Sequence, residues 1–213
     1  MGTITLNKLG GYCLILGPLT ALIFWLIAPG GAIVDAADPA DAQASIGAIL
    51  GNAGLAKTSF MLTTLGIMAL IVGIIAKQAT IKGNGEALAR AALPLIVIAG
   101  AGIALANGIG LVIAGDVGAA AGALYALNIG VNTVFGALLA LGLLLLALAI
   151  STGEKENKIF ALIVAAAALV SLVCQVIGGS DTSQLETTLM INGVVYVIFT
   201  LWSVMLGLNL LKE

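Results

Sequence analysis

Charged side chains are scarce in this sequence, and their scarcity identifies the class of protein. Lys, Arg, Asp and Glu make up 8% of the 213 residues, whereas about 25% is usual in soluble domains. Hydrophobic residues make up 61%, and the mean hydropathy is +1.20. So few charges cannot cover the surface of a soluble domain of this length, so the composition predicts an integral membrane protein. The net charge of -2 and the lack of a basic tract argue against a nucleic-acid partner.

Histidine is absent, and its absence removes whole classes of chemistry. A chain without imidazole has no His ligand for haem, zinc, copper or chlorophyll magnesium, and no imidazole general base. We therefore expect neither a cofactor nor a metal site that depends on His.

Long apolar stretches dominate what remains. A helix needs about 20 apolar residues to cross the hydrocarbon core of a bilayer. Six stretches qualify, and none contains Asp, Glu, Lys or Arg. They predict an all-α fold, a six-helix transmembrane bundle that forms one domain over residues 1–213. The predicted spans are residues 9–28, 59–76, 91–114, 124–150, 159–178 and 189–211.

The basic residues between the spans predict the orientation. With the N-terminus in the cytoplasm, only Lys57 falls outside. The inside segments would hold Lys8, Lys77, Lys82, Arg90, Lys155, Lys158 and Lys212. Because cytoplasmic loops of membrane proteins are enriched in Lys and Arg, we expect a multi-pass protein of the cell (inner or plasma) membrane with both termini cytoplasmic.

The first outer connection, residues 29–58, is the only long one. Asp38 fits a helix N-cap and Pro39 the first helical position. Ile46, Ile49, Leu50 and Ala53 then follow helical spacing, which predicts a short interfacial helix. Two interpretations stay open: the helix lies on the outer membrane surface, or it folds over the bundle as a lid.

Small residues recur at helical spacing within the spans. Because lipid provides no hydrophobic drive for helix association, such stripes are expected to face neighbouring helices. They predict a compact bundle with little internal void. The two clearest stripes are Gly10, Gly17, Ala21 and Ala28 on the first span, and Ser59, Thr63, Gly66 and Gly73 on the second.

The two cysteines are predicted to remain free. Cys13 lies near the inner end of the first span and Cys174 in the outer part of the fifth. A disulfide needs Cα atoms about 4.4–6.8 Å apart, which this placement does not allow.

Carboxamide side chains form the one polar cluster at membrane depth. A helical rise of about 1.5 Å per residue places five of them in the outer leaflet. An unpaired amide in hydrocarbon costs several kcal/mol, so these groups should meet each other, backbone, water or a ligand. They form either interhelical hydrogen bonds or an uncharged, outward-facing pocket for a neutral ligand or a lipid or quinone headgroup. The predicted ligand-binding residues are Asn107, Asn128, Asn132, Gln175, Asn192 and Tyr196.

Catalysis fits this sequence poorly. Intramembrane proteolysis needs paired Asp, an activated Ser or His-bound zinc, and ion coupling normally needs an intramembrane carboxylate. We expect a non-enzymatic protein with no catalytic residue, no cofactor and no metal. The leading hypothesis is an accessory or structural subunit that packs against other membrane proteins in the bilayer. The alternative is a binder or transporter of a small neutral solute or lipid.

The layout is similar to the substrate-binding components of vitamin transporters of the energy-coupling-factor type. Those proteins share the chain length, the number of helices and a first outer loop that acts as a lid. The resemblance implies an outward-facing pocket beneath residues 29–58. The first span reads Gly-Gly-Tyr-Cys-Leu-Ile-Leu-Gly over residues 10–17. It lacks the Ala-x-x-x-Ala pattern through which such components dock, so no residue role is carried over.

Overall fold

The computed structural model describes residues 5–153 and 157–212, and its secondary structure there is helical. Lys155, counted above among the inside residues, lies outside these ranges. Among the described residues, six helices are long and apolar enough to cross a membrane, as predicted. The seventh, α2, is shorter. Their bounds are α1 Leu6–Leu26, α2 Ala42–Gly51, α3 Ala53–Thr80, α4 Glu86–Ile113, α5 Ala121–Ser151, α6 Lys158–Ser180 and α7 Leu185–Leu210. Short 3-10 turns at Gly83–Gly85, Gly118–Ala120 and Thr182–Gln184 precede α4, α5 and α7.

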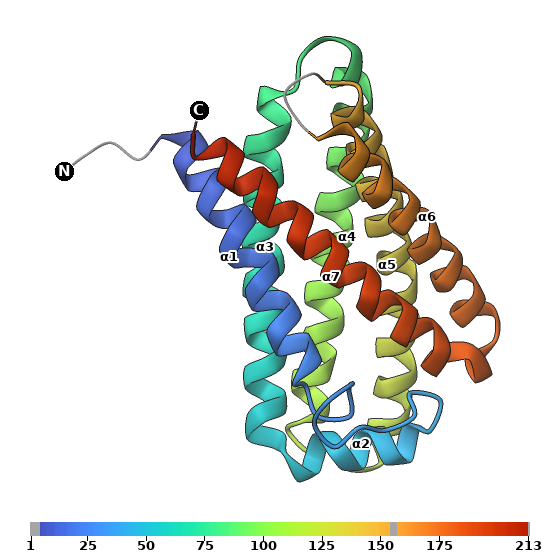
Figure 1. Cartoon of the computed structure of the whole chain (residues 1–213). Coiled ribbons are helices and arrows are strands. Elements are labelled where there is room, and N and C mark those ends of the chain that lie inside the picture. The colour runs from blue at the N-terminus through green and yellow to red at the C-terminus, as the bar shows by residue number, and fades with distance from the viewer. Residues whose placement is uncertain (1–4, 154–156, 213) are drawn as a thin grey trace.

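The spanning helices form a closed ring in the order α1, α3, α4, α5, α6, α7 and back to α1. Each packs against its two neighbours, most closely in the pairs α1 with α3 and α4 with α5. Among the described spans, the only contact across the ring is a slight one between α3 and α7. Figure 1 shows that α7 runs obliquely across the bundle, which brings it against α3.

Glycines bring α1 and α3 together, and the two predicted small-residue stripes do face each other. A Cβ atom added to Gly17 would lie 2.6 Å from the Leu70 nitrogen. One added to Gly66 would lie 2.6 Å from the Gly17 carbonyl oxygen. Gly207 of α7 meets the Gly11 carbonyl in the same way, at 2.7 Å. The backbones at these points are therefore nearly in contact, as small residues allow in membrane bundles.

The helix predicted in the first connection exists, but it begins three residues later than expected. The Asp41 carboxylate, not that of Asp38, accepts the backbone N–H groups of residues 43 and 44, at 3.0 Å each. Asp38 instead accepts the N–H of Ala40 in a turn. Ile46 and Ile49 are buried as their spacing predicted, whereas Leu50 is exposed. The helix ends at Gly51, so Ala53 belongs to α3.

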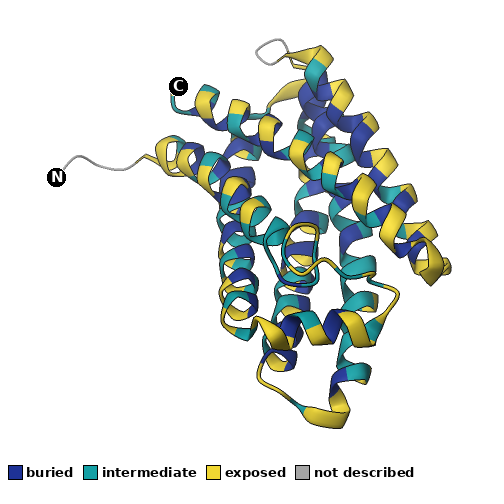
Figure 2. Ribbon diagram, turned by 60° about the horizontal axis from the view of Figure 1, so that its bottom comes forward, coloured by how far each residue is buried: buried dark blue, intermediate teal, exposed yellow. Residues whose placement is uncertain are grey.

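The two ends of the bundle differ. The start of α1 and the end of α7 lie side by side, and α2 lies across the opposite end (Figure 1). Figure 2, with the α2 end turned forward, shows the buried residues where helices face one another and the exposed ones around the outside. Many exposed residues are large and apolar, such as Leu65, Leu105 and Val194, which suits contact with lipid. Cys13 and Cys174 are both free, as predicted.

Candidate functional site

A cavity of about 340 Å³ lies within the ring of helices. All six spanning helices and α2 contribute to its wall. Ligand pockets in proteins commonly have volumes of about 300–1,000 Å³, so this one is large enough for a small molecule. The prediction of a bundle with little internal void is therefore wrong. The small residues close the contacts between neighbouring helices, but they do not fill the middle of the ring.

The six residues predicted to bind a ligand all line this cavity: Asn107, Asn128, Asn132, Gln175, Asn192 and Tyr196. They come from α4, α5, α6 and α7. The structure therefore brings the whole set together around one space. Their role in ligand binding remains a prediction.

Three of these amides also bridge neighbouring helices. Asn107 donates to the Thr64 hydroxyl of α3 at 3.0 Å, and Asn128 donates to the Ala106 carbonyl of α4 at 2.6 Å. Asn192 accepts a hydrogen bond of 2.6 Å from the Ser171 hydroxyl of α6. The amides thus combine both interpretations, since they join helices and also present polar atoms at the cavity wall.

The other members of the set hold one another in place. The Asn132 side chain donates to the Asn128 side-chain oxygen at 3.0 Å, one turn away on α5. Gln175 packs over Gly136, where an added Cβ would lie 2.6 Å from its amide nitrogen. Tyr196 interacts with Gln175 and forms a T-shaped ring pair with Trp25 at a centroid distance of 5.5 Å. The polar end of the cavity therefore consists of several small hydrogen-bonded groups beside aromatic rings.

The segment between α1 and α3 covers the polar end of the cavity. Pro29, Pro39, Ser45 and Ile49 belong to the cavity wall. The Tyr125 hydroxyl of α5 donates to the Pro39 carbonyl at 3.1 Å, which fastens the segment to the bundle. Ile46 and Ile49 are also buried against the ends of the spans, so α2 packs directly on the bundle.

Below the amides the wall becomes apolar, and its far end holds an ionisable side chain. Ile67, Leu70 and Ile74 of α3 line the middle of the cavity, and Lys77 lines its far end. Lys77 is 4% exposed and lies inside α3, not in a connection as predicted. The prediction of a pocket without ionisable groups is therefore wrong. The sequence pattern failed here because the predicted span ended at the first charged residue.

Both tryptophans of the chain, Trp25 and Trp202, also line the cavity, and the residue pattern did not single them out. Trp202 is 4% exposed, deep on α7. The fluorescence of their indole rings can therefore report on a molecule in the cavity. Within the described ranges, no group of three or more His, Cys, Asp or Glu side chains is placed to hold a metal ion.

Comparisons with known proteins return nothing for this chain: no family model, no curated protein and no solved structure matches it.

Proposed function

We propose that this chain is a non-enzymatic integral membrane protein that binds a small, mostly apolar molecule in its central cavity. The observation that carries the proposal is the convergence of all six polar candidates on one cavity. Amides at one end would recognise an uncharged polar group, and the apolar wall would hold hydrocarbon. The segment containing α2 would act as the lid of the site, on the outer side of the cell membrane, with both termini cytoplasmic.

The ring geometry supports binding within the chain over packing alone. The glycine stripes that first suggested a docking subunit are used between α1 and α3, so they are not available to a partner. The cavity, in contrast, holds polar atoms that remain beside empty space after their helix-bridging bonds are made.

Tryptophan quenching tests the proposal directly, because bromine on a bound molecule quenches nearby indole fluorescence. Protein in lipid nanodiscs is titrated with ω-bromododecanol, and saturable quenching is expected from Trp25 and Trp202. A Thr63→Phe substitution places a ring in the cavity wall and should abolish the saturable phase. Thr58→Phe is the matched control, because Thr58 is exposed on the outside of the same helix. Equal quenching in both variants, or none in the wild type, contradicts the proposal.

A second candidate, the accessory or structural subunit, is favoured by one outward stripe on α5. Gly122, Ala126 and Gly130 follow one another at intervals of four residues, about one helical turn. Ala126 and Gly130 are exposed. A Cβ atom added to either glycine would have no atom within 4 Å. Stripes of this kind let a second helix approach closely in a membrane.

This candidate predicts a stoichiometric partner that depends on the α5 stripe. The chain purified from its native membranes in mild detergent should carry the partner, and Gly130→Leu should release it. Ala166→Leu, on the exposed face of α6, should leave the complex intact. Purification of the wild-type chain strictly alone would count against a subunit role.

A further inference from the structure

One charged side chain lies in the wall of the cavity among the described residues, and that is Lys77. It is 4% exposed, so the surrounding helices cover almost its whole surface. An ionisable residue buried within a membrane span usually marks a functional site, because placing it there is costly. Lys77 also takes part in an interaction within the chain. A lysine ammonium carries three donors, so it can also bind a ligand oxygen.

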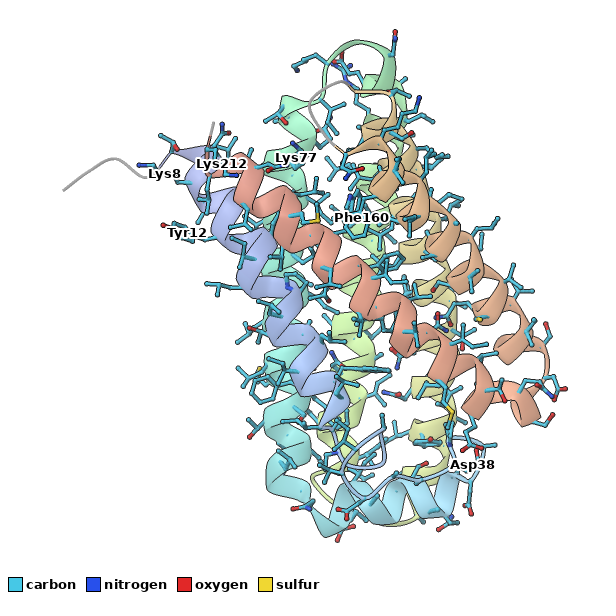
Figure 3. All side chains as sticks on the ribbon, viewed as in Figure 1. Lys8, Tyr12, Asp38, Lys77, Phe160 and Lys212 are labelled. Atoms are coloured by element: carbon cyan, nitrogen blue, oxygen red, sulfur yellow. The ribbon has the colours of Figure 1, made fainter. Side chains whose placement is uncertain are left out.

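Lys77 and the amides lie at opposite ends of the same space. Thr63 lines the cavity near the amides, and Lys77 follows fourteen residues later on the same helix. At the helical rise this separation is about 21 Å. Figure 3 shows Lys77 towards the end where Lys8 and Lys212 lie, with Asp38 at the opposite end.

The wall between the two polar ends is hydrocarbon. On α3 it consists of Ile67, Leu70, Ile71 and Ile74, and Leu143, Leu146 and Leu206 face it from other helices. A space with an ammonium at one end and an apolar wall beyond it is complementary to a molecule with an anionic head and a single chain. The volume of about 340 Å³ is near the lower limit for ligand pockets, which favours one chain over two.

We propose that Lys77 is the headgroup site for a single-chain anionic amphiphile, a chain carboxylate or a chain phosphate, whose hydrocarbon occupies the middle of the cavity. The proposal rests on the proposed function and specifies its ligand class. The low dielectric of the surroundings strengthens the attraction between ammonium and anion. The chain gains by leaving water for the apolar wall.

The test compares probes that share a chain and differ only in the head. Protein in nanodiscs is titrated with ω-bromododecanoate and with ω-bromododecanol, and quenching of Trp25 and Trp202 reports binding. Wild-type protein should bind the carboxylate about ten- to a hundredfold more tightly, which is the range expected for one charge-assisted hydrogen bond. Competition with unlabelled dodecanoate and dodecyl phosphate shows which anionic head the site prefers.

Three variants identify the source of the preference. Lys77→Met should lower the affinity for the carboxylate to that for the alcohol, while the alcohol binds as in the wild type and so reports an intact fold. Lys77→Arg should keep the preference. Lys82→Met removes an exposed positive charge near the same end and should change nothing.

The outcomes separate the two proposals. Saturable binding of the alcohol with no preference for either anion overturns the role of Lys77 and leaves the proposed function standing. A preference that survives in Lys77→Met also overturns it. Absence of saturable binding of every probe to the wild type overturns both proposals. Loss of the preference in Lys77→Met alone, with the alcohol still bound, supports both.

Discussion

Replacement of Gly66 by alanine should destabilise the protein, although alanine is the better helix former. An added Cβ at Gly66 would lie 2.6 Å from the backbone nitrogen of Ala21 and 2.6 Å from the carbonyl oxygen of Gly17. Both obstacles are backbone atoms, so no side-chain rotation relieves them and α1 must move away from α3. Overpacking of this kind costs about 1–3 kcal/mol.

A matched variant isolates the steric cost. Gly108 lies within α4, and a Cβ atom added there would have no atom within 4 Å. Replacement of a helical glycine by alanine gains about 0.5–1 kcal/mol from backbone entropy alone. This gain is common to Gly66→Ala and Gly108→Ala, so the difference between their free energies of unfolding should be about 1–3 kcal/mol.

Unfolding of purified protein in mixed micelles, followed by circular dichroism as the fraction of SDS rises, measures these free energies. Gly17→Ala meets the same contact from the other helix, at 2.7 Å from the Gly66 carbonyl oxygen. Once one alanine has separated the helices, the second costs less, so Gly17→Ala/Gly66→Ala should lose less than the sum of the single variants. Equal stability of Gly66→Ala and Gly108→Ala would refute the close approach of α1 and α3.

Two more measurements test other parts of the structure. The buried Ser203 hydroxyl donates to the Leu14 carbonyl at 2.7 Å, so Ser203→Ala should cost about 0.5–1.5 kcal/mol in the same SDS titration. Ser180→Ala, which removes an exposed bond within α6, should cost less, and equal losses would contradict the interhelical role. For the orientation, Asp38→Cys in a cysteine-free background should react with a membrane-impermeant maleimide on whole cells, and Lys82→Cys should react only after lysis. Labelling of both from the same side would show that the charge pattern was misread.

The long apolar runs and the glycine stripes were predictable, because each depends on one periodicity. A span is recognised by its length, and the facing stripes of α1 and α3 by repeated spacing along one helix. The start of α2 was not predictable in the same way. Asp38 and Asp41 carry equal capping preference, so the sequence alone does not say which of them begins the helix.

The sequence prediction missed the burial of Lys77, although a different rule would have found it. A hydropathy criterion ends a span at the first charge, whereas burial follows the face of the helix. Thr63, Leu70, Ile74 and Lys77 all line the cavity, and their spacing of seven, four and three residues keeps them on one side of α3. Extension of the inward face through Lys77 would have predicted a charge at the end of the cavity.

The cavity itself follows from the ring, which no pattern along a single helix can reveal. Packed helix axes lie about 8–10 Å apart. In a ring of six helices that contact only their neighbours, the centre is about as far from each axis as the axes are from one another, so it has room for a further helix. The slight contact between α3 and α7 narrows this space without closing it.

Side chains must therefore fill the centre, and they do so incompletely, because a cavity of about 340 Å³ remains. Three glycines of the cavity wall, Gly110, Gly136 and Gly178, are covered by the side chains of Phe60, Gln175 and Thr188. Small residues here let backbones and side chains of neighbouring helices approach closely, and the open middle follows from the ring itself. Lipid surrounds the outside of the bundle. A cavity lined with hydrocarbon binds most favourably a ligand that has a hydrocarbon chain of its own. The ring arrangement and the composition of its inner wall consequently favour the same kind of occupant, an amphiphile with its chain in the middle and its head at one polar end.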